Sequence, residues 1–292
     1  RPLRSPSRLG TSLERMLTAM ADWPAPLLFG GFLAWFIGWS VLASVLVERL
    51  VDEGDQAALA LAAGDLVPAI GVLFSFLTGF VISSQWSRSR SAEGLAGTEA
   101  DAAVQLCLAS QSPGIDGETI RHRLAAYLDL VVSADWHTLV HHSGRSHIGD
   151  RRTSDALDAL ERTARVEATA GDVSTAIAHD VLRAAEGIAV ARRDRLNLSG
   201  HGLPAPLFIL VFIAGVVLSL DAIVLSVGLD GLSGLMVGGL VVLIALDLAL
   251  IVAISDPFRG PMRALPTPIT VVRDDLHRGR FGALGRDDPS TT

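Results

Sequence analysis

Four long apolar blocks limit what this chain can fold into. They run over 27–47, 66–85, 203–227 and 232–255, and each is long enough to cross the hydrocarbon layer of a bilayer, which takes about 20 helical residues. Hydrophobic residues make up 50% of the 292, and the mean hydropathy is +0.43. Because they are gathered into blocks, they favour membrane spans over a soluble core. The sequence predicts an integral membrane protein with four transmembrane helices.

The basic residues predict the topology. All 24 are arginines, and they cluster before the first block, between the second and third blocks, and after the fourth. Only Arg49 lies between the first two blocks, and none lies between the last two. By the positive-inside rule both termini and the long central segment are cytoplasmic. The single Cys107 then lies on the reducing side, so no disulfide is expected. The net charge of -7 says little about partners, because the excess of arginine lies where cytoplasmic membrane anchoring places it, and no feature of the sequence favours nucleic acid.

The chain divides into five predicted segments, all of them helical or irregular. The apolar stripes of the central region predict helices over 119–142, 154–170 and 173–198, the middle one capped by Ser154 or Asp155. No strand pattern of period two is present, so the predicted fold class is all-α. The segments are an interfacial amphipathic N-terminus (1–24), the first two transmembrane helices (25–85), a cytoplasmic helical region (86–203), the last two transmembrane helices (204–255) and a cytoplasmic C-terminal tail (256–292).

One row of the second block is apolar at mid-membrane and small and polar at its cytoplasmic end. Every fourth residue gives Val72, Phe76, Phe80 and Ser84, which places them on one helix face. Such a row can face lipid or pack within a bundle. Four spans cannot enclose a pore by themselves, but a symmetric ring of subunits can. In such a ring the row would form an apolar constriction of the kind that gates by dewetting.

Five stretches, in this order of spans, resemble the bestrophin-like domain family of bacterial membrane proteins: "GFVISSQW", "GTEADAAVQL", "RLAAYLDLVVSADW", "ARRDRLNLSGHGLPAPL" and "SDPFRG". That family is distantly similar to bestrophins, which are pentameric anion channels whose second membrane helix lines a pore narrowed by apolar side chains. The resemblance implies a homo-oligomeric, pentameric anion or chloride channel in a bacterial plasma (inner) membrane. Through the pair Gly79 and Phe80, it implies a neck formed by Val72, Phe76 and Phe80, with Ser84 at the cytoplasmic end.

Calcium gating is not implied. Calcium-activated bestrophins resemble one another in an acidic cluster soon after the fourth span, where this chain has "SDPFRGPMRALPTPI". Asp274 and Asp275 come later, among Arg273, Arg278 and Arg280. Calcium needs about six or more converging oxygens, and two aspartates among arginines do not predict them.

The fourth block ends in a helix-terminating motif. Proline lacks the amide hydrogen that would continue the helix and disfavours helical geometry in the residue before it, and a glycine and a second proline follow. Phe258 is expected to pack against the inner helix ends, and Arg259 to face the helix C-terminus and anionic headgroups. A hinge between the cytoplasmic helices and the spans is the alternative. The motif comprises Asp256, Pro257, Phe258, Arg259 and Gly260.

Two carboxylates lie inside the predicted spans, where charge is costly and suggests function. Asp221 is expected close to the outer interface, where water can solvate it. Asp247 is the deeper of the two, and it is expected to face protein. It is either a packing residue or part of an ion or proton path.

Two polar clusters lie in the segment between the second and third blocks. His137, His141, His142 and His147 have spacings that could hold a metal, but no cysteine completes a set, and cations at a helix C-terminus are the simpler explanation. Neither a metal nor another cofactor is predicted. Arg192, Arg193 and Arg195 are predicted to form a basic collar at the inner membrane face, which could concentrate anions at a pore mouth.

The sequence carries no nucleophile elbow, phosphate loop or dinucleotide fingerprint, so an enzyme is not predicted. The first hypothesis is an anion channel whose partners are the bilayer, other copies of the chain and anions such as chloride. The second is a non-conducting membrane scaffold or regulatory protein that binds a cytoplasmic protein. The third is a proton-coupled transporter that uses Asp247.

Overall fold

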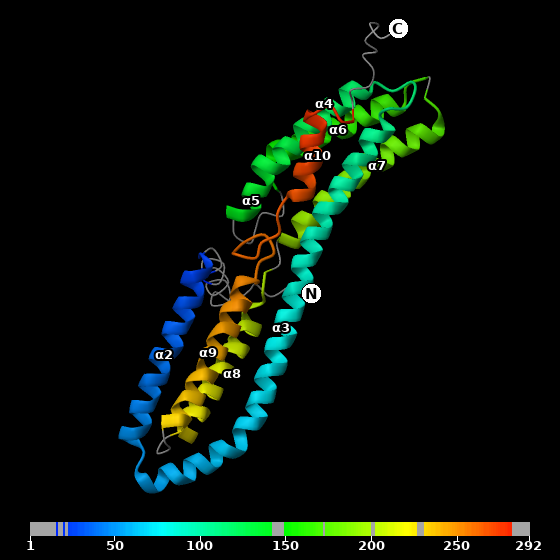
Figure 1. The fold of residues 1–292 in the computed structure, drawn as a ribbon. Helices are drawn as coiled ribbons and strands as arrows, with labels where there is room; N and C mark the ends of the chain where they lie inside the picture. The colour runs from blue at the N-terminus through cyan, green and yellow to red at the C-terminus, as the bar shows by residue number, and fades with distance from the viewer. Residues whose placement is uncertain are drawn as a thin grey trace, which may run out of the picture. The chain divides into compact units, whose positions relative to one another are not determined.

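The computed structural model describes Met16, Met20 and residues 23–141, 149–171, 173–199, 202–226 and 231–281. Within these ranges the secondary structure is helical and contains no strand, which confirms the all-α fold class. The chain forms two compact units (Figure 1). The first contains Arg1–Arg88 and Gly202–Arg263, and the second contains Ser89–His201 and Ala264–Thr292.

The first unit holds the four apolar helices. These are α2 (Ala25–Leu50), the first part of α3 (Glu53–Ala109), α8 (Ala205–Ser226) and α9 (Gly231–Ala253). Each is long and apolar enough to cross a membrane, so the four predicted spans are confirmed. Helix α2 packs against α8 and α9, and α8 packs against α9. Their shared core contains Leu28, Phe32 and Phe36 of α2, Phe74 and Val81 of α3, and Ile244 and Leu248 of α9.

Helix α3 starts earlier than predicted. The second apolar block begins at residue 66, but the helix begins at Glu53 and continues to Ala109. Residues 57–63, "AALALAA", explain the difference, because alanine and leucine have high helix propensity. Pro68 lies inside the helix, where it removes one backbone hydrogen bond and favours a bend. Figure 1 shows that the beginning of α3 runs at an angle to the rest of the helix within the first unit.

The second unit is a group of helices around the last part of α3. It contains α4 (Gly117–Leu130), a π-helix η1 (Val131–Asp135), α5 (Trp136–His141), α6 (Arg151–Ala168), α7 (Thr175–Ser199) and α10 (Thr267–His277). Helix α6 packs against α4 and α7, and α10 packs against α4. The helix predicted over 119–142 is thus interrupted by a π turn, which no local pattern indicated.

The cap of α6 differs from the prediction. Asp150 is the N-cap, and its Oδ1 accepts a hydrogen bond from the backbone N–H of Thr153 at 3.2 Å. Ser154 and Asp155, the predicted caps, are the fourth and fifth residues of the helix. The amphipathic helix predicted near the N-terminus lies outside the described residues, apart from Met16 and Met20.

Candidate functional site

The predicted neck residues lie on one exposed face of α3. The exposed fractions of their side chains in the single chain are 71% for Val72, 70% for Phe76 and 57% for Phe80. Ser84, the next residue of the row, is half-buried. The row therefore does not pack within the chain's own bundle, and in a membrane it would face lipid or another subunit.

The opposite face of α3 fixes this orientation. Phe74 is 5% exposed and Val81 is fully buried, and both belong to the core of the first unit. The backbone of Gly215 in α8 makes this packing possible. A Cβ at Gly215 would lie 3.2 Å from Cε2 of Phe74 and 2.9 Å from Cγ2 of Ile244, so even a methyl group would be crowded here.

Polar groups follow the row at the end of this part of α3. Gln85 is buried, and the guanidinium of Arg88 donates a hydrogen bond to the carbonyl oxygen of Gly202 at 3.0 Å. Gly202 directly precedes the third span. This bond links the end of the α3 span to the start of α8 within the first unit.

The motif after α9 is a compact turn. Asp256 Oδ1 accepts a hydrogen bond from the backbone N–H of Phe258 at 2.9 Å, and Gly260 has a φ of +77°, which favours glycine. Phe258 is buried, as expected for a residue that packs against protein. Arg259 is also buried, and its Nε lies 3.9 Å from Oδ2 of Asp256. Its side chain is thus enclosed by protein within the described part of the chain, whereas the sequence favoured contact with headgroups.

Both carboxylates within the spans are half-buried. Oδ2 of Asp221 is buried and has no hydrogen-bond partner among the residues that the structure describes. Ser219 lies two residues before Asp221. Its hydroxyl accepts a hydrogen bond from Nε1 of Trp39 at 3.2 Å, and this bond connects α2 to α8. The expectation that Asp247 faces protein, and any role of either carboxylate in transport, stay predictions.

Two of the three arginines assigned to a basic collar form a buried ion network in the second unit. Arg195 Nε donates to Oε2 of Glu99 at 2.9 Å, and its Nη2 donates to Oδ2 of Asp135 at 3.1 Å. Arg192 donates to both carboxylate oxygens of Asp135, at 3.2 and 3.1 Å. Tyr127 donates its hydroxyl to Oε1 of Glu99 at 2.6 Å. Arg193 is exposed, so it alone of the three is available to a charged surface.

The charges of the network compensate one another. Burial by itself would raise the pKa of Asp135, but the charges of Arg195 and Arg192, with their hydrogen bonds, hold that pKa below its ordinary value. Burial opposes the charge of Arg195 as well, yet Glu99 and Asp135 raise its pKa. Burial, followed by the charge of Glu99, raises the pKa of Tyr127 well above its usual range. Asp135 and Arg195 therefore remain charged at neutral pH, and Tyr127 remains protonated.

The residues of this network lie in three of the stretches that carry the family resemblance. Glu99 lies in "GTEADAAVQL", Tyr127 and Asp135 in "RLAAYLDLVVSADW", and both arginines in "ARRDRLNLSGHGLPAPL". Sequence reasoning missed the network, although one signal was present. Glu99 lies on the same helix stripe as Ala92, Ala96, Ala103 and Leu106, all of them buried, and a carboxylate on an apolar stripe needs a buried partner.

The histidine cluster cannot be assembled from the described residues. His137 lies in α5, whereas His142 and His147 fall outside the described residues. Within the described ranges no three histidine, cysteine or acidic side chains group in a way that could hold a metal ion.

These features define a helical membrane protein with four spans and a second helical unit held by buried ion pairs. A model of the Bestrophin-like domain matches residues 34–269. The chain therefore belongs to the bestrophin-like family.

Solved structures have the same fold. One variant of a bacterial bestrophin homologue from Klebsiella pneumoniae is 16% identical, has a TM-score of 0.66, and aligns over 86% of this chain and 96% of its own. Another variant of that homologue is 14% identical, has a TM-score of 0.64, and aligns over 85% and 99%. None of the curated proteins compared with the chain matches it.

Proposed function

We propose that this protein is a homo-oligomeric anion channel of the bacterial plasma membrane, with five subunits around the axis and chloride among the permeant ions. The first part of α3 lines the pore, and Val72, Phe76 and Phe80 form its neck. Membership of the bestrophin-like family supports the channel class. The observation that carries the neck is the outward orientation of this apolar row on the single chain.

The physical argument for a neck starts from the spacing of the row. Successive members are four residues apart, which is about 6 Å along a helix. Around a symmetric axis they would make three stacked apolar rings. An anion in such a constriction sheds much of its hydration without a compensating charge, and water itself leaves the narrow apolar space. The rings therefore act as a barrier that small changes in width can open or close.

The test is the double substitution Phe76→Ala and Phe80→Ala in the full chain. Removing both rings of aromatic side chains should widen and wet the constriction, so anion flux into liposomes should rise and gating should weaken. The matched control is Leu243→Ala on α9, because Leu243 is 61% exposed but lies on another helix. Phe74, on the opposite face of the same helix, is unsuitable as a control because it is part of the core.

The outcome separates the channel from the scaffold. A ring of subunits in particle images, with flux raised by the double substitution and not by the control, supports the channel. If the assembled double variant carries no more anion than protein-free liposomes, the protein does not conduct through this row. A monomer or simple dimer that binds a cytoplasmic protein would then favour the scaffold.

A further inference from the structure

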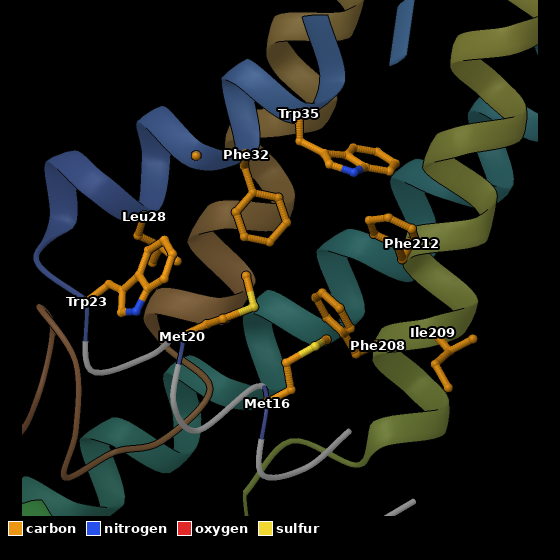
Figure 2. A pocket seen from close by; sticks show the side chains of 10 residues that line it. Met16, Met20, Trp23, Leu28, Phe32, Trp35, Phe208, Ile209 and Phe212 are labelled. Atoms are coloured by element: carbon orange, nitrogen blue, oxygen red, sulfur yellow. The ribbon is translucent and has the colours of Figure 1, made fainter. Parts of the chain in front are cut away.

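An apolar slot opens on the first unit beside the beginning of α2. Its cavity volume is about 470 Å³, and it is lined by residues of α2 and α8 together with Met16, Met20 and Trp23. Figure 2 shows Met20, Phe32, Trp35, Phe208 and Phe212 around it. The aromatic wall is continuous, since the ring centroids of Trp35 and Phe212 are 5.1 Å apart and those of Phe208 and Phe212 are 6.1 Å apart. Every lining side chain is apolar except for the indole nitrogens of the two tryptophans.

The slot occupies the depth of one bilayer leaflet. It ends at Trp35, ten residues after the start of α2 at Ala25, which is roughly 15 Å of helix. Half of a hydrocarbon core about 30 Å thick has the same depth. Phe208 and Phe212 are the fourth and eighth residues of α8, so α2 and α8 both begin at the end of the slot opposite Trp35. By the arginine distribution, this is the cytoplasmic leaflet.

The size and chemistry of the slot select its occupant. A helix about 10 Å in diameter that filled the same length would need roughly 1,200 Å³, which exceeds the cavity. A flexible hydrocarbon chain fits a narrower space. Methionine side chains adapt to irregular apolar partners, and Met16 and Met20 form one wall. We propose that this slot holds an acyl chain of an anionic phospholipid from the cytoplasmic leaflet.

The anionic headgroup follows from the charge of the adjoining sequence. Met16 directly follows Arg15, and Arg1, Arg4 and Arg8 precede it, whereas Glu14 is the only acidic residue among the first fifteen. Basic residues next to a membrane surface attract anionic lipids. Because one peptide bond joins Arg15 to Met16, which lines the slot, an acyl chain that enters beside Met16 leaves its phosphate next to the backbone that carries Arg15. This site is separate from the proposed pore, so its test needs no ion flux.

Gly31 provides a way to fill the slot without straining the helix. It lines the slot, and a Cβ built on it meets only Cζ3 of Trp23, at an ordinary contact distance of 3.8 Å. Gly31→Leu should therefore place its side chain in the cavity. Gly30→Leu is the matched control, because Gly30 is the neighbouring residue, does not line the slot, and has nothing within 4 Å of its Cβ.

The experiment measures lipid retained by the purified full chain. Native mass spectrometry of the assembled protein, with phosphatidylglycerol or phosphatidylcholine added, should show phosphatidylglycerol bound preferentially. Gly31→Leu should weaken this binding roughly tenfold, which corresponds to about 1.4 kcal/mol, and Gly30→Leu should leave it unchanged. Arg8→Gln with Arg15→Gln should reduce the preference for phosphatidylglycerol over phosphatidylcholine.

A measurement on the unmodified protein keeps the proposal testable if Gly31→Leu fails to fold. Trp23 and Trp35 line the slot, so phosphatidylglycerol brominated in its acyl chain should quench tryptophan fluorescence more than brominated phosphatidylcholine does. Equal quenching by the two lipids would overturn the proposal. So would unchanged lipid retention in folded Gly31→Leu, or a change in subunit number without loss of lipid, which would indicate that another copy of the chain fills the slot.

Discussion

At the residue scale, neighbouring arginines on one helix have different surroundings. Arg192 and Arg195 of α7 are buried and paired with carboxylates, whereas Arg193 between them is exposed. Positions three apart share a helix face, and the next residue points about 100° away. A buried guanidinium is stable only when it is paired, and breaking such a pair leaves an uncompensated buried charge. The three arginines are therefore not equivalent, although the sequence presents them as one basic stretch.

This difference predicts unequal effects of the same substitution. Arg195→Met should destabilise the folded protein by about 3–5 kcal/mol, because the carboxylates of Glu99 and Asp135 lose a buried partner. Arg193→Met, on the exposed side of the same turn, should stay within about 0.5 kcal/mol. Thermal unfolding of the two variants in one detergent measures the difference. Equal unfolding midpoints would show that the network contributes little to stability.

The lowered pKa of Asp135 predicts how this contribution depends on pH. A carboxylate whose pKa is depressed in the folded state contributes stability above its unfolded pKa, which is about 3.9, and loses it as the pH falls through the lower folded value. The difference in unfolding midpoint between the natural protein and Asp135→Asn should therefore be constant from pH 8 to pH 5. It should shrink only below about pH 4. A difference that disappeared near pH 6 would contradict this assignment.

At the element scale, one close approach holds the span part of α3 against its neighbours. The backbone of Gly215 leaves room for Phe74 of α3 and Ile244 of α9, so the exposed row on the far side of α3 depends on a contact made behind it. Small residues at such crossings let membrane helices pack closely. The orientation of the row is thus determined by packing between helices.

Gly215→Ala should therefore destabilise the first unit. The added methyl group would lie 2.9 Å from Cγ2 of Ile244, and overpacking of this kind costs about 1–3 kcal/mol. Gly239→Ala on α9 is the control, since nothing lies within 4 Å of a Cβ there. The midpoint of unfolding by denaturant in detergent compares them. An equal response to both substitutions would mean that the packing of α3 relaxes easily around Gly215.

Helix positions could be predicted from the sequence more readily than the contacts between helices. The central residues of α2, α8 and α9 coincide with the predicted apolar blocks, because a helix in lipid requires an unbroken apolar run. The apolar block does not mark the start of α3, because residues 57–63 extend the helix through their helix propensity before the apolar run begins. The position of Glu99 on an apolar stripe indicates a buried partner, but the identity of that partner could not be predicted. Glu99, Asp135 and Arg195 are far apart in sequence, and only tertiary packing brings them together.

At the scale of the whole molecule, the arginine distribution predicts a cytoplasmic C-terminus. A reporter that is active only in the cytoplasm should be active when fused after Thr292, and one that is active only outside the membrane should be inactive. The same reporters inserted after Asp52, between the first two spans, should give the opposite result. Activity of the external reporter after Thr292 would overturn the topology, and with it the leaflet assigned to the acyl slot.

The π-helix at Val131–Asp135 joins α4 to α5, and it affects where the length of this continuous helical segment can change. A π turn accommodates about one residue more than an α turn. The side chains of α5 therefore point in the directions that they would have in an uninterrupted α-helix with one residue fewer. In this orientation the ring of Trp136 lies 5.0 Å from the guanidinium carbon of Arg195. Removing one residue from the turn, such as Ser133, would convert it to an α turn and leave Trp136 facing Arg195. The same deletion inside α4 or α5 would rotate every later side chain by about 100°. Natural changes in length are therefore expected to concentrate at this turn.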